Sequence, residues 1–142
     1  MDPVTLSTTQ ASRITLSLTN LQWSDDGLTP PPFYALDGRL VVDIDGQSFF
    51  DAVILPLELG EQLARWYALV KSSIVQTFTY NSIESDEGPL LVFQQVTPTT
   101  WTLVSPWEER PAPKDLALQH LIDLTQAFHA LISQGLAERS QR

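Results

Sequence analysis

The dipeptide Asp45-Gly46 lies between two runs of strand-forming residues, and this arrangement constrains the fold more than any other feature of the sequence. The flanking segments, 38–44 and 47–54, are rich in Val, Ile and Phe. An Asp-Gly pair accepts the positive φ angles of a type I′ turn, which joins two antiparallel strands through only two residues. The sequence therefore predicts a β-hairpin.

Apolar residues occupy both faces of this hairpin. In the register that a two-residue turn sets, Val42 would lie opposite Phe49, and Val41 opposite Phe50. A strand that is apolar on both faces is typical of the interior of a sheet. We therefore expect the hairpin to be central rather than at an edge.

The spacing of the apolar residues predicts four more strands and two helices, because strands alternate with period two and helices repeat every 3.6 residues. The expected strands are 13–18, 74–80, 89–96 and 100–105, and the expected helices are 57–72 and 114–134. We expect the first strand to end or bulge near Asn20, Asp115 to act at the start of the second helix, Gly135 to end it, and the tail 137–142 to fray.

The order β-β-β-α-β-β-β-α predicts an α+β fold. We expect one antiparallel sheet of about five to six strands, with both helices packed on one face as a second layer. A chain of 142 residues, 43% of them hydrophobic, is long enough to bury one core. The sequence thus predicts a single domain over residues 1–142.

Composition narrows the classes of function. Because the chain has no cysteine, it can form neither disulfides nor thiolate metal sites, and we expect a cytoplasmic protein. No apolar run approaches the length of a membrane span, and no secretory signal is recognisable at the N-terminus. Seventeen acidic residues against eight basic ones give a charge of −9, which disfavours nucleic acid and anionic membranes. The charge favours a basic protein partner, although it is also compatible with a role in solubility alone.

Known catalytic and metal-binding patterns do not fit the sequence. Aligning Gly46 with the invariant glycine of a calcium loop places Val41 and Ala52 at ligand positions, so that match fails. His120 and His129 are nine residues apart and would project from opposite edges of one helix. Nucleophile elbows and phosphate-binding glycine patterns are also absent from the sequence. We therefore expect no metal, no cofactor and no enzymatic activity.

Three acidic clusters in predicted loops stand beside aromatic or apolar residues, a combination that is common at protein interfaces. Core tryptophans next to solvated loops would explain the same pattern. The residues we predict to bind a partner are Trp23, Asp25, Asp26, Glu84, Asp86, Glu87, Trp107, Glu108 and Glu109.

The architecture of this small, acidic, cysteine-free chain resembles the immunity proteins of bacterial polymorphic toxin systems. The resemblance covers the segment 40–46, the helix at 59–70 and the strands at 90–107. It implies an antitoxin that binds a cognate basic toxin and occludes its active site.

Two alternatives remain open from the sequence. One is a homodimeric structural or adaptor module, with Leu69 as an exposed contact on the polar side of the first helix. The other is a small-ligand or enzymatic domain, with a pocket between sheet and helices lined by Trp66, Tyr67 and Phe128.

Overall fold

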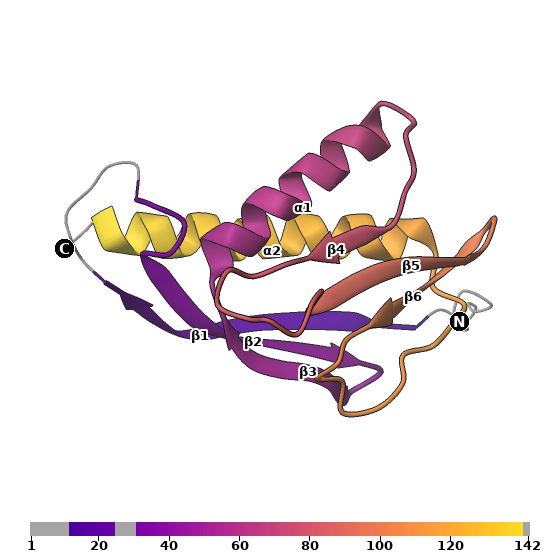
Figure 1. Ribbon diagram of the computed structural model, residues 1–142, viewed down its shortest axis with the longest axis horizontal. Helices are drawn as coiled ribbons and strands as arrows, with labels where there is room; N and C mark the ends of the chain where they lie inside the picture. Colours follow the sequence, from indigo (N-terminus) through magenta and orange to yellow (C-terminus); the bar gives the residue numbers. More distant parts are fainter. Residues whose placement is uncertain (1–11, 25–30, 141–142) are drawn as a thin grey trace, which may run out of the picture.

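In the part of the chain that the structure describes, six strands and two helices follow one another in the predicted order (Figure 1). The computed structural model describes residues 12–24 and 31–140. The elements are β1 (Ile14–Trp23), β2 (Leu36–Ile44), β3 (Gln47–Ile54), α1 (Pro56–Lys71), β4 (Phe78–Tyr80), β5 (Leu91–Thr97), β6 (Thr100–Val104) and α2 (Leu118–Ser140). The α+β class is confirmed. Within this described part of the chain, no helix is both long and apolar enough to cross a membrane.

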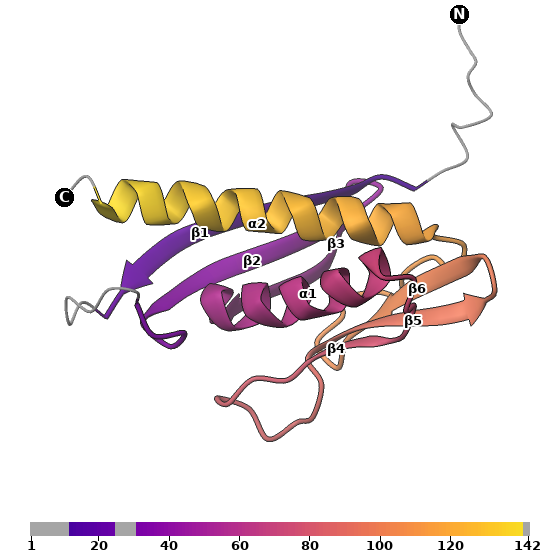
Figure 2. The same cartoon turned by 90° about the horizontal axis from the view of Figure 1, so that it is seen from above.

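The prediction of one sheet of five to six strands is wrong. The strands form two antiparallel sheets of three, ordered β1-β2-β3 and β4-β5-β6. Figure 2 shows α1 lying between α2 and β4. Side chains of α1 bond to the backbone on either side of β4, from Gln62 to Asn81 and from Trp66 to Gln76. The edge of β4 therefore faces the helix instead of continuing the first sheet.

Both helices cover the same face of the β1-β2-β3 sheet, side by side (Figures 1 and 2). They approach closely at Gly60 of α1, where an added Cβ would lie 2.6 Å from Ile132 Cδ1. His129 of α2 bonds through Nε2 to the Gly60 carbonyl at 2.8 Å. The sequence pattern alone gave no sign of this contact, which fixes the two helices against each other.

The turn of the predicted hairpin and the irregularity in β1 are both confirmed. Asp45 has φ 54° and Gly46 has φ 80°, as a type I′ turn requires. Asn20 also has a positive φ, 54°, and the pairing of β1 with β2 shifts register between Thr19 and Gln22. The strand bulges there and continues.

The predicted register of the hairpin is wrong by one residue. Val42 pairs with Phe50 and Val41 with Asp51, because a β-bulge places Phe49 as an extra residue in β3. The bulge allows both phenylalanines to be fully buried, although they are adjacent in sequence. Of the two strands of the hairpin, β2 is central and β3 forms an edge of the sheet.

The bounds of α2 differ from the prediction at both ends. The chain before the helix pairs with β6 instead, since Trp101 and Leu116 exchange backbone hydrogen bonds of 2.7 and 3.0 Å. Asp115 therefore stands next to Leu116, the residue that pairs with β6. It does not lie in the first turn of the helix, which begins at Leu118. Gly135 does not end the helix, which continues to Ser140, so residues 137–140 of the predicted frayed tail are helical. Residues 141 and 142 lie outside the described residues.

Gly135 serves the contact between α2 and β1. The residue is buried, and an added Cβ would lie 3.0 Å from Leu21 Cδ1. A larger side chain would push Leu21 aside, so the close approach of helix and strand explains glycine at this position.

The turn that ends α1 explains why the strand predicted at 74–80 begins only at Phe78. Ser73 has φ 66°, its N–H bonds to the Val70 carbonyl, and the Ile74 N–H bonds to the Leu69 carbonyl. This pair of bonds is a Schellman motif, in which the residue after the helix adopts the left-handed conformation. The motif reverses the chain, so residues 74–77 lead back along the helix without pairing as a strand.

We expect Ser73→Gly to stabilise the protein by about 0.5–1 kcal/mol. Glycine adopts a positive φ without the steric cost that serine incurs, and part of that gain is lost to the greater freedom of glycine in the unfolded chain. Urea denaturation measures the change. Ser72→Gly, at a residue with φ −93°, is the control and should not stabilise the protein. A less stable Ser73→Gly protein would contradict this account of the helix end.

Candidate functional site

Trp107 joins two of the acidic loops that the sequence singled out. Its indole Nε1–H donates to both carboxylate oxygens of Glu87, each at 3.1 Å. Its ring stacks on Phe50 of β3, with centroids 6.2 Å apart and planes inclined by 28°. The loop 81–90 and the turn 105–110, twenty residues apart in sequence, therefore meet at one half-buried tryptophan.

The acidic residues on these two loops are mostly exposed. The carboxylates of Glu84, Asp86, Glu87 and Glu109 belong to exposed residues. Glu108 is half-buried and accepts a hydrogen bond from the Ser105 N–H at 3.0 Å, so it also shapes the turn. We call these five carboxylates and Trp107 the acidic face.

The backbone of the acidic face is tied to the first sheet. The N–H of Glu109 donates to the Phe49 carbonyl at 2.8 Å, at the bulge in β3. Together with the stacking of Trp107 on Phe50, this bond fixes the turn 105–110 against the sheet edge. The position of the face thus depends on the bulge that the sequence did not reveal.

Of the third predicted cluster, the structure describes only Trp23, which does not join this face. Trp23 pairs with Leu36 at the end of the β1-β2 ladder far from the Asp45-Gly46 turn, and its side chain is half-buried. Asp25 and Asp26 lie outside the described residues. Of the nine predicted residues, the structure therefore joins Trp107 to Glu87 directly, and Glu84, Asp86, Glu108 and Glu109 lie on the two loops that this contact connects.

Arg39 and Arg110 both lie close to the acidic face, and Arg39 is already paired with a carboxylate. Arg39 of β2 donates to both carboxylate oxygens of Asp51 in β3, at 2.7 and 2.6 Å. These hydrogen bonds lower the pKa of Asp51, and the same pair, with a smaller contribution from nearby Glu109, raises the pKa of Arg39. Arg39 is thus balanced chiefly by Asp51. Arg110 follows Glu109 in the turn 105–110 and donates to the neutral side chain of Gln47 at 3.0 Å, so it offsets part of the negative charge of the acidic face.

The buried carboxylate of Glu58 anchors the start of the loop 81–90. Glu58 of α1 is only 6% exposed. It accepts the Tyr80 hydroxyl at 2.7 Å and the Ile83 N–H at 3.1 Å. The sequence pattern placed Glu58 on the polar side of the helix. It gave no sign that the residue is buried, because both of its partners are more than twenty residues away in the chain. It fixes the start of the loop that carries Glu84.

We expect Tyr80 to make the protein less stable at alkaline pH. Burial, together with the hydrogen bond to Glu58, raises its pKa above the ordinary value of about 10. Above that pH the unfolded chain loses the phenolic proton while the folded protein retains it. The free energy of unfolding therefore falls as pH rises, by up to about 1.4 kcal/mol per pH unit.

Urea denaturation between pH 8 and pH 11 tests this expectation. Tyr80→Phe should remove this contribution to the pH dependence of the free energy of unfolding. At neutral pH it should lower the free energy of unfolding by about 1–2 kcal/mol, since Glu58 loses a hydrogen-bond donor. Tyr34→Phe, at an exposed residue, is the control and should keep the slope of the wild type. Equal slopes in all three proteins would exclude Tyr80 as the cause.

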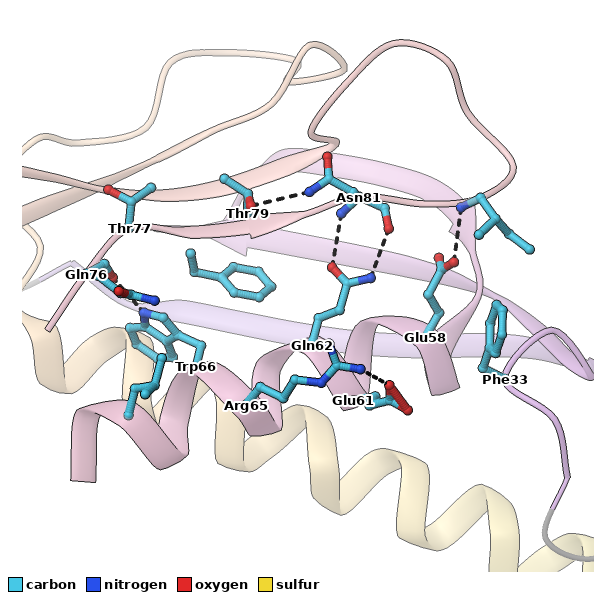
Figure 3. Close-up of a pocket in the computed structure, with 13 residues that line it drawn as sticks. Phe33, Glu58, Glu61, Gln62, Arg65, Trp66, Gln76, Thr77, Thr79 and Asn81 are labelled. Atoms are coloured by element: carbon cyan, nitrogen blue, oxygen red, sulfur yellow. Dashed lines mark hydrogen bonds and ion pairs between the residues drawn. The ribbon is translucent and has the colours of Figure 1, made fainter. Parts of the chain in front are cut away.

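A groove of about 490 Å³ lies between α1 and β4 (Figure 3). Its lining includes Trp66 and Phe78 together with Glu61, Gln62 and Arg65 of the helix. Glu61 and Arg65 form an exposed ion pair one helical turn apart. The groove is therefore apolar where the helix meets the strand and charged along its rim.

The groove differs from the pocket that the sequence suggested. Trp66 lines it, but Phe128 is buried in the core. Tyr67 lies outside the lining residues, with its hydroxyl accepting from Gln126. Leu69 was expected as an exposed contact, whereas it is half-buried and lines the groove.

The two histidines have structural partners. His120 accepts the Ala117 N–H through Nδ1 at 2.9 Å, just before the start of α2, and His129 contacts Gly60 as described above. Over residues 12–24 and 31–140, no cluster of three or more His, Asp or Glu side chains could hold a metal ion.

A family model described as a domain of unknown function, DUF7878, matches residues 15–138. No curated protein and no solved structure matches the chain.

Proposed function

We propose that this chain, which belongs to the DUF7878 family, is a non-catalytic domain that binds a basic protein through its acidic face. We further propose that the partner is a cognate toxin, which the chain neutralises by covering the active site. The observation that carries the proposal is the hydrogen bond from Trp107 to Glu87, because it joins two acidic loops into one surface.

The composition of the acidic face suits this role. Exposed carboxylates attract a cationic partner and raise the rate of association, while an aromatic side chain supplies contact area that slows dissociation. Trp107 is half-buried and held on both sides, by Phe50 and Glu87. Little conformational entropy would therefore be lost when a partner covers it.

The loops that carry the face are also held in place before any partner binds. Glu58 anchors Ile83 at the start of one loop, and Phe49 of β3 anchors Glu109 in the other. A preformed surface is what stoichiometric inhibition requires, since the inhibitor must bind without first ordering its own loops.

Calorimetric titration against the protein encoded next to this chain's own gene tests the proposal. We expect a one-to-one complex with a dissociation constant in the micromolar range or tighter, and loss of the partner's toxicity when the two are co-expressed. Absence of a complex at micromolar concentrations, or a complex that leaves the toxicity unchanged, would contradict the proposal.

A further inference from the structure

An exposed isoleucine adjoins the acidic face. The side chain of Ile83 is 68% exposed, and the next residue along the chain, Glu84, carries the first carboxylate of that face. The backbone of Ile83 is nevertheless fixed, because its N–H donates to the buried carboxylate of Glu58 at 3.1 Å. A large apolar side chain is therefore held in solvent beside the carboxylates, without being needed in the core.

Two exposed aromatic side chains lie at the same end of α1 as Ile83. Phe33 is 39% exposed and Tyr34 53% exposed, and their rings pack edge-to-face with centroids 5.6 Å apart. Phe33 and Ile83 both line the groove, and Figure 3 shows Phe33 beside Glu58, which holds the Ile83 N–H. We call Phe33, Tyr34 and Ile83 the apolar patch.

The aromatic part of the apolar patch is also held by its backbone. The Ala35 N–H donates to the Pro32 carbonyl at 2.9 Å, which closes a β-turn with Phe33 and Tyr34 at its two central positions. The Ala35 carbonyl in turn accepts the Ser24 N–H at 2.8 Å. Because aromatic side chains have only two rotatable bonds, a partner that covers them loses little conformational entropy in doing so.

The acidic face by itself lacks the apolar centre of a stable interface. It offers five carboxylates and one half-buried aromatic ring, that of Trp107. A stable protein interface takes roughly 20–30 residues from each partner, and its centre is poor in charged residues and rich in aromatic ones. The apolar patch borders the acidic face through the bond between residues 83 and 84, and groups of exposed apolar side chains are typical of interaction surfaces.

We propose that the apolar patch forms the second half of the interface with the basic partner. Apolar side chains of the partner pack on Phe33, Tyr34 and Ile83, while its lysine or arginine side chains face the carboxylates of the loop 81–90. The matching partner surface is therefore an apolar cluster bordered by basic residues. The inference rests on the proposed function, since the partner is the one that the acidic face binds.

The rate of dissociation tests the apolar patch, because short-range apolar contacts chiefly slow dissociation whereas charge chiefly speeds association. The probe is the complex with the protein encoded next to this chain's own gene. Ile83→Ser removes the exposed side chain and keeps the backbone N–H that bonds to Glu58. We expect it to raise the dissociation rate constant at least about tenfold, and to leave the association rate constant within about twofold, at both low and high salt.

A second substitution and a matched control complete the experiment. Adding Tyr34→Ser to Ile83→Ser should raise the dissociation rate constant at least about thirtyfold. The control is Ile74→Ser, the same change at a 49% exposed residue that follows the far end of α1. Since α1 has 16 residues, the two isoleucines lie at opposite ends of a helix roughly 24 Å long. The control should dissociate as the wild type does, and urea denaturation checks that all variants fold.

Failure of this inference is distinguishable from failure of the proposed function. A complex whose dissociation rate is unchanged by both patch variants, or is raised equally by Ile74→Ser, would overturn the apolar patch and leave the acidic face standing. A wild-type homodimer that Ile83→Ser separates in sedimentation would mean that the patch binds a second copy of the chain, and would also overturn the inference. Absence of any complex at micromolar concentrations would overturn the proposed function and this inference with it.

Discussion

Replacing Trp66 with alanine is expected to lower the free energy of unfolding by about 3–5 kcal/mol, as is usual when a buried aromatic side chain is truncated. Trp66 is 3% exposed and packs edge-to-face on Phe93, with centroids 5.2 Å apart. It also contacts Phe78 and bonds to the Gln76 carbonyl. The substitution would leave a cavity between α1 and the second sheet, and a carbonyl without its donor.

The expected loss is large for a domain of this size, whose total stability is typically about 5–15 kcal/mol. Trp66→Phe is the matched control, because it keeps an aromatic ring in place and removes the indole N–H. We expect it to cost about 1–2 kcal/mol, chiefly from the unpaired Gln76 carbonyl. Urea denaturation measures both variants, and a cost below about 1 kcal/mol for Trp66→Ala would show that this residue does not join α1 to the second sheet.

Reversing three charges on the acidic face is expected to slow association with the basic partner by about tenfold to a hundredfold at low ionic strength. The variant combines Glu84→Lys, Asp86→Lys and Glu109→Lys, all at exposed residues. Glu87 and Glu108 remain unchanged because they hold Trp107 and the turn. The protein should therefore keep its fold and its stability.

The control for this variant changes the net charge by the same amount elsewhere. Asp115→Lys, Asp123→Lys and Glu138→Lys together reverse three exposed carboxylates on or just before α2. If the acidic face is the binding surface, the control should slow association far less than the variant of the face. Equal rates of association for the two variants would mean that the charge acts diffusely over the whole molecule.

Local patterns in the sequence predicted the order of the elements well. The Asp45-Gly46 turn depends on the conformational preferences of two adjacent residues, and the apolar spacing of α1 depends on residues within a few turns of one another. The bulge at Phe49 was not predictable in the same way, since it depends on how both phenylalanines fit into a core formed by distant elements. The division into two sheets depends on α1 bonding to residues beside β4, which no local pattern encodes.

The candidate site was predictable in part. Acidic clusters beside tryptophan are visible in the sequence, but the contact of Trp107 with Glu87 spans twenty residues. The burial of Glu58 was not predicted, because it depends on a hydrogen bond with Tyr80, which is twenty-two residues away in the chain. Its spacing with Gln62 and Trp66, one turn of helix each, is a signal that could have marked the helix face that holds β4.

The dependence of the association rate on ionic strength tests the central claim most directly. Stopped-flow measurements from about 20 to 500 mM salt would compare the wild type, the variant of the acidic face and the α2 control. We predict a steep decrease in the rate constant with salt for the wild type and the control, because screening weakens the attraction between opposite charges. The variant of the face should show little dependence. A salt dependence that is the same in all three proteins would contradict binding through the acidic face.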